Sequence, residues 1–456
     1  MKKIFDGDSM VKTIMGAKKV KPGCVYRWSC FTVPYTHNDR RYIFNNFSKV
    51  CFGVEPDELD LRTEARFTSE QAAADKNLSA LVSDLFLIPE DEDEAASYEK
   101  YAAMFRAMRT NKKGYSSYTI LPTTACNARC FYCFEEGMRF VTMTDEIVSQ
   151  TIEFIKKTRN PEKPVNFAWF GGEPLAGERI IDRICAAMRE ENIEFKSKMV
   201  SNGSLITEKI IQKMKNDWNL GAIQITLDGV EEEYNRRKNY VFNYASAYWH
   251  VLSRIKLINE NGIKLNIRVN VDEGNIDGLP QMAEDVKCFV PNTELVTFDL
   301  TPLFDIHEVK DDSAVWRKSF EISERLEAMG FKAAAHYSVS RTKVFFCMAD
   351  SPYSSVAIAP DGRLYPCEDI SNIGSLGDVF EGVTNRELVN SLQRVEKTRE
   401  QCRGCFSLPQ CTTFSRCKNR SASCRYYSRK RLERALSHKL DSLTDENDDK
   451  DTEMIC

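Results

Sequence analysis

The sequence lacks the features that mark membrane and secreted proteins. None of its apolar runs is long enough to span a bilayer, and the lysine-dotted start has no signal-peptide core. It also lacks an excess of one charge, because 63 Lys and Arg residues face 67 Asp and Glu residues for a formal net charge of -4. This balance excludes bulk attraction to nucleic acid or to an anionic membrane. We therefore expect a cytoplasmic protein with neither nucleic acid nor membrane as a partner.

Histidine is scarce, and cysteine is not. The five histidines have no ligand-spaced partners, and we interpret each as structural. The 16 cysteines occur in a chain without an export signal, and cytosolic thiols stay reduced. This argues against a disulfide framework and for metal or redox sites. Two spaced groups hold most of the cysteines, and the remainder are interpreted as small buried hydrophobes or ordinary surface thiols.

The first group, Cys126, Cys130 and Cys133, has the spacing C-x3-C-x2-C. A structural zinc site needs four protein ligands, whereas a 4Fe-4S cube held by three thiolates keeps one iron free. A zinc knuckle or three core cysteines remain alternatives. The spacing, with an aromatic residue before the last cysteine, resembles the signature of the radical S-adenosylmethionine (SAM) superfamily. The resemblance implies that a SAM-binding 4Fe-4S cluster cleaves SAM to a 5′-deoxyadenosyl radical.

Downstream of Cys133, strand-like and helix-like segments alternate, which predicts parallel βα units. The expected strands are 118–121, 165–170, 197–201, 222–227, 265–271 and 295–300, and the expected helices lie near 143–158, 177–192, 207–218, 243–261, 277–288 and 313–329. These six units resemble the α/β fold of the radical SAM family, a partial (β/α)6 TIM-like barrel. Active sites in such barrels lie at the carboxyl ends of the strands.

Short motifs fall at these expected strand ends. Gly171-Gly172-Glu173-Pro174 resembles the family's GGEP motif, which contacts the amino group of SAM; the glycines let backbone approach a ligand, and Glu173 can meet the ammonium. Two further segments resemble those that line the SAM pocket with short hydroxyl, amide and carboxylate side chains, here Ser201, Asn202, Thr226 and Asp228. Ordinary turns are the alternative for every one of these segments.

A cation for the SAM carboxylate is expected after Asp228. Family members often place a histidine and then an arginine there; in this chain Tyr234 replaces the histidine, and the cation comes from Arg236, Arg237 or Lys238. We assign Arg237 to the cofactor site, and the choice among the three stays open. Arg268 lies between apolar residues on the fifth expected strand, so we expect it to point into the barrel and assign it to the same site.

The second group contains seven cysteines in the pattern C-x14-G-x4-C, a gap, then C-x2-C-x5-C-x5-C-x6-C. It resembles the SPASM domain, which binds two auxiliary 4Fe-4S clusters in a subset of radical SAM enzymes. Family pairing implies an outer cluster on Cys402, Cys405, Cys411 and Cys424 and an inner cluster on Cys347, Cys367 and Cys417. The family usually has three residues, not five, before its sixth cysteine, which puts the role of Cys417 in doubt.

Two fully ligated cubes need eight cysteines, so seven leave the inner cluster with an open iron that a substrate thiolate can bind. A carboxylate or Cys288 as eighth ligand, or two zinc ions, are alternatives. Glu368 directly follows Cys367. In the related sulfatase-maturating enzymes, an acidic residue at this place takes a proton from the substrate, and the resemblance implies this catalytic role for Glu368. Tuning of the nearby cluster is the alternative role.

The segment before the barrel has strand-like runs at 42–44 and 50–52, a helical pattern from Thr68, an apolar strand before Pro89 and a linker helix near 98–108. This order resembles the winged-helix α+β module called a RiPP recognition element, where RiPPs are ribosomally made, post-translationally modified peptides. Such modules bind the leader of a precursor peptide as an extra strand on a sheet edge. A structural cap on the barrel is the alternative.

The expected organisation is an unassigned extension at 1–34, the peptide-binding module at 35–112, the barrel at 113–335, the SPASM domain at 336–430, and a C-terminal helix with an acidic, disordered tail at 431–456. Together the resemblances imply a peptide maturase of the sactipeptide or ranthipeptide type. It would join a cysteine sulfur of the precursor core to a carbon, with electrons from a flavodoxin or ferredoxin. Alternatives are a peptide carbon–carbon cross-link, epimerisation, formylglycine formation in a sulfatase, or a non-catalytic iron–sulfur or zinc scaffold.

Overall fold

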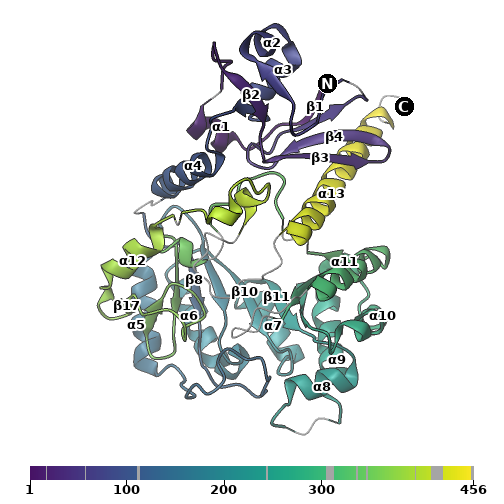
Figure 1. Ribbon diagram of the computed structural model, residues 1–456. Helices are drawn as coiled ribbons and strands as arrows, with labels where there is room; N and C mark the ends of the chain where they lie inside the picture. The colour runs from purple at the N-terminus through teal and green to yellow at the C-terminus, as the bar shows by residue number, and fades with distance from the viewer. Residues whose placement is uncertain are drawn as a thin grey trace.

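The computed structural model describes residues 1–16, 18–56, 58–109, 113–242, 245–303, 313–334, 337–345, 348–395, 397–411 and 425–452. Four parts follow one another: an N-terminal module, a barrel, a cysteine-bearing extension (337–411) and a long C-terminal helix (Figure 1). None of the helices in these ranges combines the length and apolarity needed to cross a membrane.

The barrel is built on parallel strands that pair in chain order. These strands are β8 (Ser117–Ile120), β9 (Val165–Trp169), β10 (Phe195–Ser201), β11 (Leu220–Thr226), β12 (Lys264–Val271) and β13 (Val296–Pro302). Each expected strand lies within about two residues of an observed one. The α/β barrel predicted from the alternating segments is therefore confirmed.

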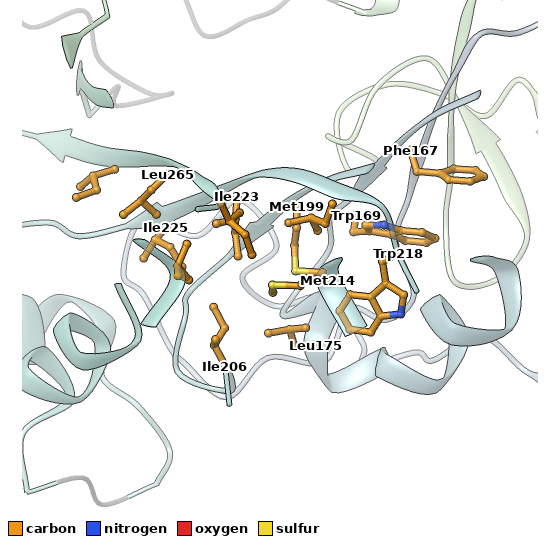
Figure 2. Close-up of a cluster of buried hydrophobic side chains, with 14 of the residues drawn as sticks. Phe167, Trp169, Leu175, Met199, Ile206, Met214, Trp218, Ile223, Ile225 and Leu265 are labelled. Atoms are coloured by element: carbon orange, nitrogen blue, oxygen red, sulfur yellow. The ribbon is translucent and has the colours of Figure 1, made fainter. Parts of the chain in front are cut away.

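Amphipathic helices cover the outer face of this sheet: α5 (Asp145–Thr158), α6 (Glu178–Glu190), α7 (Glu208–Asn216), α9 (Ala247–Glu260), α10 (Leu279–Phe289) and α11 (Ser313–Ala328). Strand side chains alternate between faces, so every second residue of β12 is buried against these helices and the others face the barrel interior. Figure 2 shows Met199, Ile223 and Ile225 of neighbouring strands on the face toward Ile206 and Met214. This packing leaves the polar strand ends to form the site.

One barrel helix, α8 (Glu231–Lys238), has no counterpart among the expected elements. Its sequence is polar all round, so no apolar stripe marks it. It nevertheless buries Tyr234, Arg237 and Lys238. Tyr234 joins the barrel core and lies 5.9 Å from the ring of Tyr248 in α9, while Lys238 faces the site.

The extension continues the barrel sheet. Strand β15 (Ser355–Ile358) pairs in parallel with β8, and β16 (Arg363–Tyr365), β17 (Gly377–Asp378) and β18 (Gly382–Val383) follow as antiparallel strands. With β14 (Lys332–Ala333) at the far edge, the described residues form an eleven-stranded sheet. Helix α12 (Arg386–Gln393) completes this part. Cys367 is therefore placed by strands that are hydrogen-bonded to the barrel.

The N-terminal module contains two small sheets. One has the order β1 (Lys2–Phe5), β5 (Cys51–Val54), β4 (Arg40–Asn45), β3 (Thr32–His37), and the other has the order β6 (Arg66–Thr68), β2 (Val25–Trp28), β7 (Leu87–Pro89). The helices are α1 (Ser9–Met15), α2 (Ser69–Ala74), α3 (Lys76–Ser83) and α4 (Glu94–Arg109). The expected hairpin is present as β4 and β5. Residues 1–34, unassigned from sequence, supply β1, α1, β2 and the start of β3.

The C-terminal helix α13 (Arg425–Thr452) lies alongside β3 and β4 (Figure 1). Its Leu432 and Leu436 form one core cluster with Val33 and Phe44 of the module. The acidic stretch continues this helix as far as Thr452, where the sequence favoured a disordered tail. A helix already anchored on a sheet extends without a new nucleation cost, which accounts for the difference.

Candidate functional site

The three-cysteine loop follows the carboxyl end of β8 and has a compact backbone. The N–H of Cys133 donates to the carbonyl of Cys130 at 3.0 Å. Cys126 Sγ accepts from the N–H of Ala128 at 3.4 Å and from Nδ2 of Asn202 at 3.9 Å. Burial raises the pKa of Cys126 to about 11, and the neighbouring Cys130 and Cys133 add to the shift. The three thiols are thus close enough to interact.

The donor chemistry of this loop fits an iron–sulfur cluster. All three cysteines are free thiols, two of them half-buried and Cys133 exposed, and N–H groups point at the Cys126 sulfur. Across the described ranges, no three His, Cys, Asp or Glu side chains converge on a single-ion site.

The two glycines of the GGEP segment let this segment pack against the cluster loop. Gly171 has φ +112°, and a Cβ on it would lie 2.4 Å from the carbonyl oxygen of Thr123. A Cβ on Gly172 would lie 2.5 Å from the carbonyl oxygen of Ala125. The N–H of Glu173 donates to that same Ala125 carbonyl at 2.9 Å. The close approach allowed by these glycines is thus to the backbone that carries Cys126.

Glu173 joins two of the predicted segments. Its buried carboxylate accepts from Ser201 Oγ at 2.9 Å, from the N–H of Asn202 at 2.8 Å and from the N–H of Leu175 at 3.1 Å. Burial raises the pKa of Glu173 above its usual value, although these hydrogen bonds oppose the shift. Pro174 is buried and opens the short 3-10 helix η1 (Pro174–Gly177) directly after it. The structure therefore brings Glu173, Ser201 and Asn202 together.

Asp228 lies in a second buried polar cluster with a residue of the cysteine loop. The Tyr132 hydroxyl donates to Asp228 Oδ2, and Oδ1 accepts from the N–H of Asn270 at 2.8 Å. Lys238 Nζ lies 3.4 Å from Asp228 Oδ2 and donates to the Tyr132 hydroxyl at 3.0 Å. Burial alone would lower the pKa of Lys238, but Tyr132 and Asp228 hold it well above the usual value. The cluster joins the ends of β11 and β12 to the loop.

The candidate cations differ in what they contact. Arg237 forms two bonds to Asp272, at 2.9 and 2.5 Å, and a third to Glu233, so its guanidinium is occupied by carboxylates. Arg268 donates to Asp299 at 2.9 Å on the inward-facing side of β12, where Thr226 is its partner in β11. Of the three cations left open by sequence, Lys238 is the one that pairs with Asp228, while Arg237 reaches the cysteine loop by lying 5.4 Å over the Phe131 ring.

The contacts of two further site residues were not predicted from the sequence. Tyr132 is the aromatic residue before the third cysteine, and its contact with Asp228 and Lys238 depends on residues about a hundred positions away. Asn127 links the loop to β10, because its side chain accepts from Asn202 Nδ2 at 2.8 Å and donates to Ser204 Oγ at 2.9 Å.

The second cysteine group is described in part. Cys347, Cys417 and Cys424 lie outside the described residues. Cys367 is half-buried against the barrel core. Cys402, Cys405 and Cys411 are half-buried in a loop where the N–H of Cys405 donates to the Cys402 carbonyl at 3.1 Å. Cys288 is exposed on α10, which lies across the barrel from β17 and α12 (Figure 1), so the fold does not favour it as an eighth ligand.

Glu368 is half-buried directly after Cys367. Its backbone carbonyl accepts from the N–H of Ile370 at 2.9 Å, and its carboxylate makes no hydrogen bond to any described residue. An unengaged carboxylate of this kind can accept a proton from a bound group.

Comparisons with known proteins agree with this geometry. Residues 120–286 match the family model described as the radical SAM superfamily. The chain is 24% identical over 301 residues to the antilisterial bacteriocin subtilosin biosynthesis protein AlbA of Bacillus subtilis, covering 61% of this chain and 62% of AlbA. It is 21% identical over 358 residues to the radical SAM cyclopropyl synthase TigE of Paramaledivibacter caminithermalis, and this match covers 72% of this chain and 73% of TigE. A probable GTP 3′,8-cyclase of Thermococcus kodakarensis is 20% identical over 301 residues, and this match covers 61% of this chain and 93% of the cyclase.

Two solved structures share the fold. The structure of anSMEcpe with bound AdoMet, which is SAM, superposes with a TM-score of 0.56 at 18% identity and covers 73% of this chain and 99% of anSMEcpe. Streptococcus suis SuiB bound to precursor peptide SuiA superposes with a TM-score of 0.51 at 13% identity, covering 88% and 99%. The match to AlbA spans less than two thirds of that protein's length.

Proposed function

From the premise that this chain is a radical SAM enzyme, we propose that it matures a ribosomally made precursor peptide by joining a cysteine sulfur to a carbon. The observation that carries the proposal is the packing of an α+β module onto a cysteine-bearing extension of the barrel. The fold likeness to SuiB bound to its precursor peptide covers 88% of this chain, which is more than the barrel alone. Similarity to AlbA, a bacteriocin biosynthesis protein, adds support.

A radical SAM domain implies a SAM-binding 4Fe-4S cluster, which Cys126, Cys130 and Cys133 would hold. When bound, the cluster and SAM supply hydrogen-atom abstraction from an unactivated carbon. Around this site, Glu173 fixes the backbone of Asn202 and would offer a carboxylate to the SAM ammonium. Lys238 and Arg268 are the candidate partners for the SAM carboxylate. Their existing contacts to Asp228 and Asp299 keep both cations in place at the strand ends.

The extension would hold two auxiliary 4Fe-4S clusters and receive the substrate thiol. Cys367, Cys402, Cys405 and Cys411 are half-buried cysteines of the extension, and thiolates are the ligands that such clusters use. Forming a carbon–sulfur bond from C–H and S–H releases a hydrogen atom from carbon, a proton from sulfur and one electron. Glu368 would accept the proton, and an auxiliary cluster is the kind of group that accepts the electron.

The leader of the precursor would bind the N-terminal module by strand addition. Strand β7 is an edge of its sheet, and a pocket beside it is lined by Leu87, Ile88 and Pro89. Lys18, Lys19 and Lys21 line the same pocket. An extended segment with apolar side chains and a carboxylate would complement this surface.

Carbon–carbon bond formation is the second candidate. The alignment with the cyclopropyl synthase TigE covers 72% of this chain, against 61% for AlbA, so it includes more of the sequence outside the barrel. The two candidates differ in whether a cysteine sulfur of the peptide takes part.

The deciding experiment is anaerobic. Iron and sulfide content and 5′-deoxyadenosine formation after reduction are measured for the wild type and for Cys126→Ala/Cys130→Ala/Cys133→Ala. We expect about twelve irons in the wild type and about eight in the variant, with nucleoside formed by the wild type alone. About four irons in the wild type would contradict the presence of the two auxiliary clusters. Absence of SAM cleavage by reduced, iron-loaded protein would overturn the proposal.

The peptide is tested next by mass spectrometry. The wild-type enzyme should remove one H2 from a cognate precursor peptide, and a peptide with its core cysteines changed to alanine should stay unmodified. If the alanine peptide shows the same mass change, the thioether proposal is wrong and the carbon–carbon candidate gains support.

A further inference from the structure

One cysteine outside the two spaced groups lies next to the second group. Cys30 is half-buried in the turn between β2 and β3 of the N-terminal module. It packs in one core cluster with Leu408, which is three residues after Cys405 in the extension. Burial raises the pKa of the Cys30 thiol, and the nearby Glu94 carboxylate and Cys405 raise it further. The structure therefore brings a thiol of the module close to a thiol of the extension.

A buried asparagine fixes this approach. The N–H of Asn46 donates to the carbonyl of Phe31 at 2.8 Å, and its Nδ2 donates to the carbonyl of Phe406 at 2.7 Å. Phe31 directly follows Cys30, and Phe406 directly follows Cys405. Because Asn46 is fully buried, loss of either hydrogen bond would leave a polar group without a partner. The two cysteine-bearing segments are thus held together through one side chain.

A second link joins the same turn to the other end of the cysteine loop. The N–H of Cys30 donates to Glu94 Oε2 at 3.0 Å. The preceding residue, Asp93, accepts from the guanidinium of Arg403 at 2.6 Å, and Arg403 directly follows Cys402. The turn that carries Cys30 is therefore linked to the loop at two points.

Tyr337 connects a further cysteine to this junction. Its hydroxyl accepts from Asn46 Nδ2 at 2.8 Å. Burial raises the pKa of Tyr337, and Cys405 and Cys411 both add to the shift. Both thiols therefore lie near the tyrosine that Asn46 contacts. Four half-buried cysteines of the described chain thus gather at one junction: Cys30, Cys402, Cys405 and Cys411.

The charges around Cys30 are compatible with a thiolate ligand. The Glu94 carboxylate pairs with the Arg27 guanidinium at 2.8 Å. Arg27 lowers the pKa of Cys30 and so offsets part of the repulsion from Glu94. A bound metal ion deprotonates a coordinating thiol outright. The raised pKa of the metal-free thiol therefore does not oppose ligation.

We propose that Cys30 is a ligand of the outer auxiliary cluster, held with Cys402, Cys405 and Cys411. The proposal rests on the proposed function, because it needs an auxiliary cluster at this loop. A 4Fe-4S cube takes four thiolates, and these are the four that the described part of the chain brings to the junction. A cluster bound in this way would join the N-terminal module to the extension through iron–sulfur bonds.

The assignment changes the number of available ligands. Two fully ligated cubes need eight cysteines, and Cys30 raises the number from seven to eight. Cys424, which family pairing gives to the outer cluster, would then be available to the inner one. Both cubes would be complete, so activation of the substrate thiol would depend on Glu368 and not on an open iron.

The test uses the full chain, loaded with iron and sulfide under anaerobic conditions. Cys30→Ala is compared with Cys24→Ala, a matched control because Cys24 is also half-buried in the module. The wild type and the control should hold about twelve irons. Cys30→Ala should lose between about one iron, with the electron paramagnetic resonance signal of a three-iron cluster, and about four irons, the whole outer cube. Cys30→Ser, which offers an oxygen ligand, should keep about twelve irons and shift the reduction potential of one auxiliary cluster.

Thiol labelling gives a readout that needs no variant. Iodoacetamide labelling, mapped by mass spectrometry, should modify Cys30 and Cys405 in the iron-free chain and neither of them in the loaded chain. Cys24 should be labelled equally in both.

Wild-type iron content and spectra in Cys30→Ala, or labelling of Cys30 in the loaded chain, would overturn the inference. Iron loss from Cys30→Ala and Cys30→Ser alike, together with lost exchange protection in β2 and β7, would overturn it too and indicate that Cys30 only supports the fold of the module. About four irons in the wild type would refute the auxiliary clusters of the proposed function, and the inference with them. Twelve irons in the wild type with unchanged variants would refute the inference alone.

Discussion

The barrel and the N-terminal module are stabilised in different ways. The barrel has one core cluster whose residues run from Tyr118 to Leu392, and strands that follow one another in the sequence are neighbours in the sheet. The module has three smaller clusters, and two of them include side chains from distant parts of the chain, such as Val344, Leu408 and Leu436. The barrel therefore shares one continuous core with the extension that continues its sheet, whereas the smaller clusters of the module depend on the extension and the C-terminal helix.

The junction between module and extension is polar and buried. Asn46 donates to the carbonyl of Phe406 at 2.7 Å and to the hydroxyl of Tyr337 at 2.8 Å. Lys49 is fully buried and donates to Asn46 Oδ1 at 2.7 Å and to the carbonyl of Ser338 at 3.1 Å. One turn of the module thus contacts two segments of the extension, one of which lies directly beside Cys405. Changes in the loop that carries Cys402, Cys405 and Cys411 would therefore reach the N-terminal module through this turn.

The largest effect should come from breaking the buried polar cluster of the barrel. Asp228→Asn leaves the Lys238 ammonium buried without a counter-charge, and removal of one partner of a buried ion pair costs about 3–5 kcal/mol. Because the barrel has one core, we expect loss of hydrogen-exchange protection across β10–β13. Chemical denaturation measures the change in the free energy of unfolding, and exchange mass spectrometry measures the loss of protection. Thr226→Ala, at the neighbouring half-buried position, is the control.

A substitution in the C-terminal helix should destabilise the N-terminal module and leave the barrel intact. Leu436 is fully buried against the module, and Leu436→Ala should cost about 2–5 kcal/mol of local stability. Exchange should rise in β3 and β4, while the barrel strands keep their protection and SAM cleavage continues. Ser442→Ala, at an exposed position of α13, should leave exchange unchanged. Loss of protection across the barrel would contradict the separation of the two regions.

The polar junction should have a smaller effect. Asn46→Ala removes two hydrogen bonds to the extension and leaves Lys49 with one partner fewer, for a cost of about 1–3 kcal/mol. We expect faster exchange at 337–345 and around Phe406, together with altered electron paramagnetic resonance signals of the auxiliary clusters proposed for the extension. Unchanged signals in the variant would show that the junction does not affect the loop that carries Cys402, Cys405 and Cys411.

The smallest effect is expected for the surface link between the same regions. Arg403 and Asp93 pair at 2.6 Å, but both side chains are 40% or more exposed. Solvent-exposed pairs contribute about 0–1 kcal/mol, so Arg403→Ala should barely change the denaturation midpoint. Comparison with Asn46→Ala separates buried from exposed contacts at one interface.

Sequence reasoning succeeded where the physical signal is local. The barrel strands show themselves as short apolar runs between helical patterns, so their positions were predicted closely. Helix α8 was missed because Tyr234 is its one aromatic or apolar residue, so its sequence has no apolar stripe. Strands β1 and β2 were missed because their partners, β5 and β7, lie far along the chain.

In the site, too, local motifs were predicted from the sequence, and contacts between distant segments were not. Glu173, Ser201 and Asn202 were predicted from motifs at strand ends, and the structure brings them together. The ion pairs of Arg237 with Asp272 and Glu233 could not be predicted, because they depend on the approach of separate loops. In the same way, the role of Gly171 and Gly172 in admitting the backbone of the cysteine loop follows from tertiary contacts.

The docking of α13 on the first sheet has a consequence for synthesis on the ribosome. About 390 residues separate Phe44 from Leu436, and at ~5–20 residues per second their translation takes roughly 20–80 s. During this interval the nascent module has an uncovered apolar sheet face and the unpaired edge of β3, both of which invite aggregation. The part of the chain that is made first is thus completed last, so we expect its yield in the cell to depend on chaperone supply more than that of the barrel.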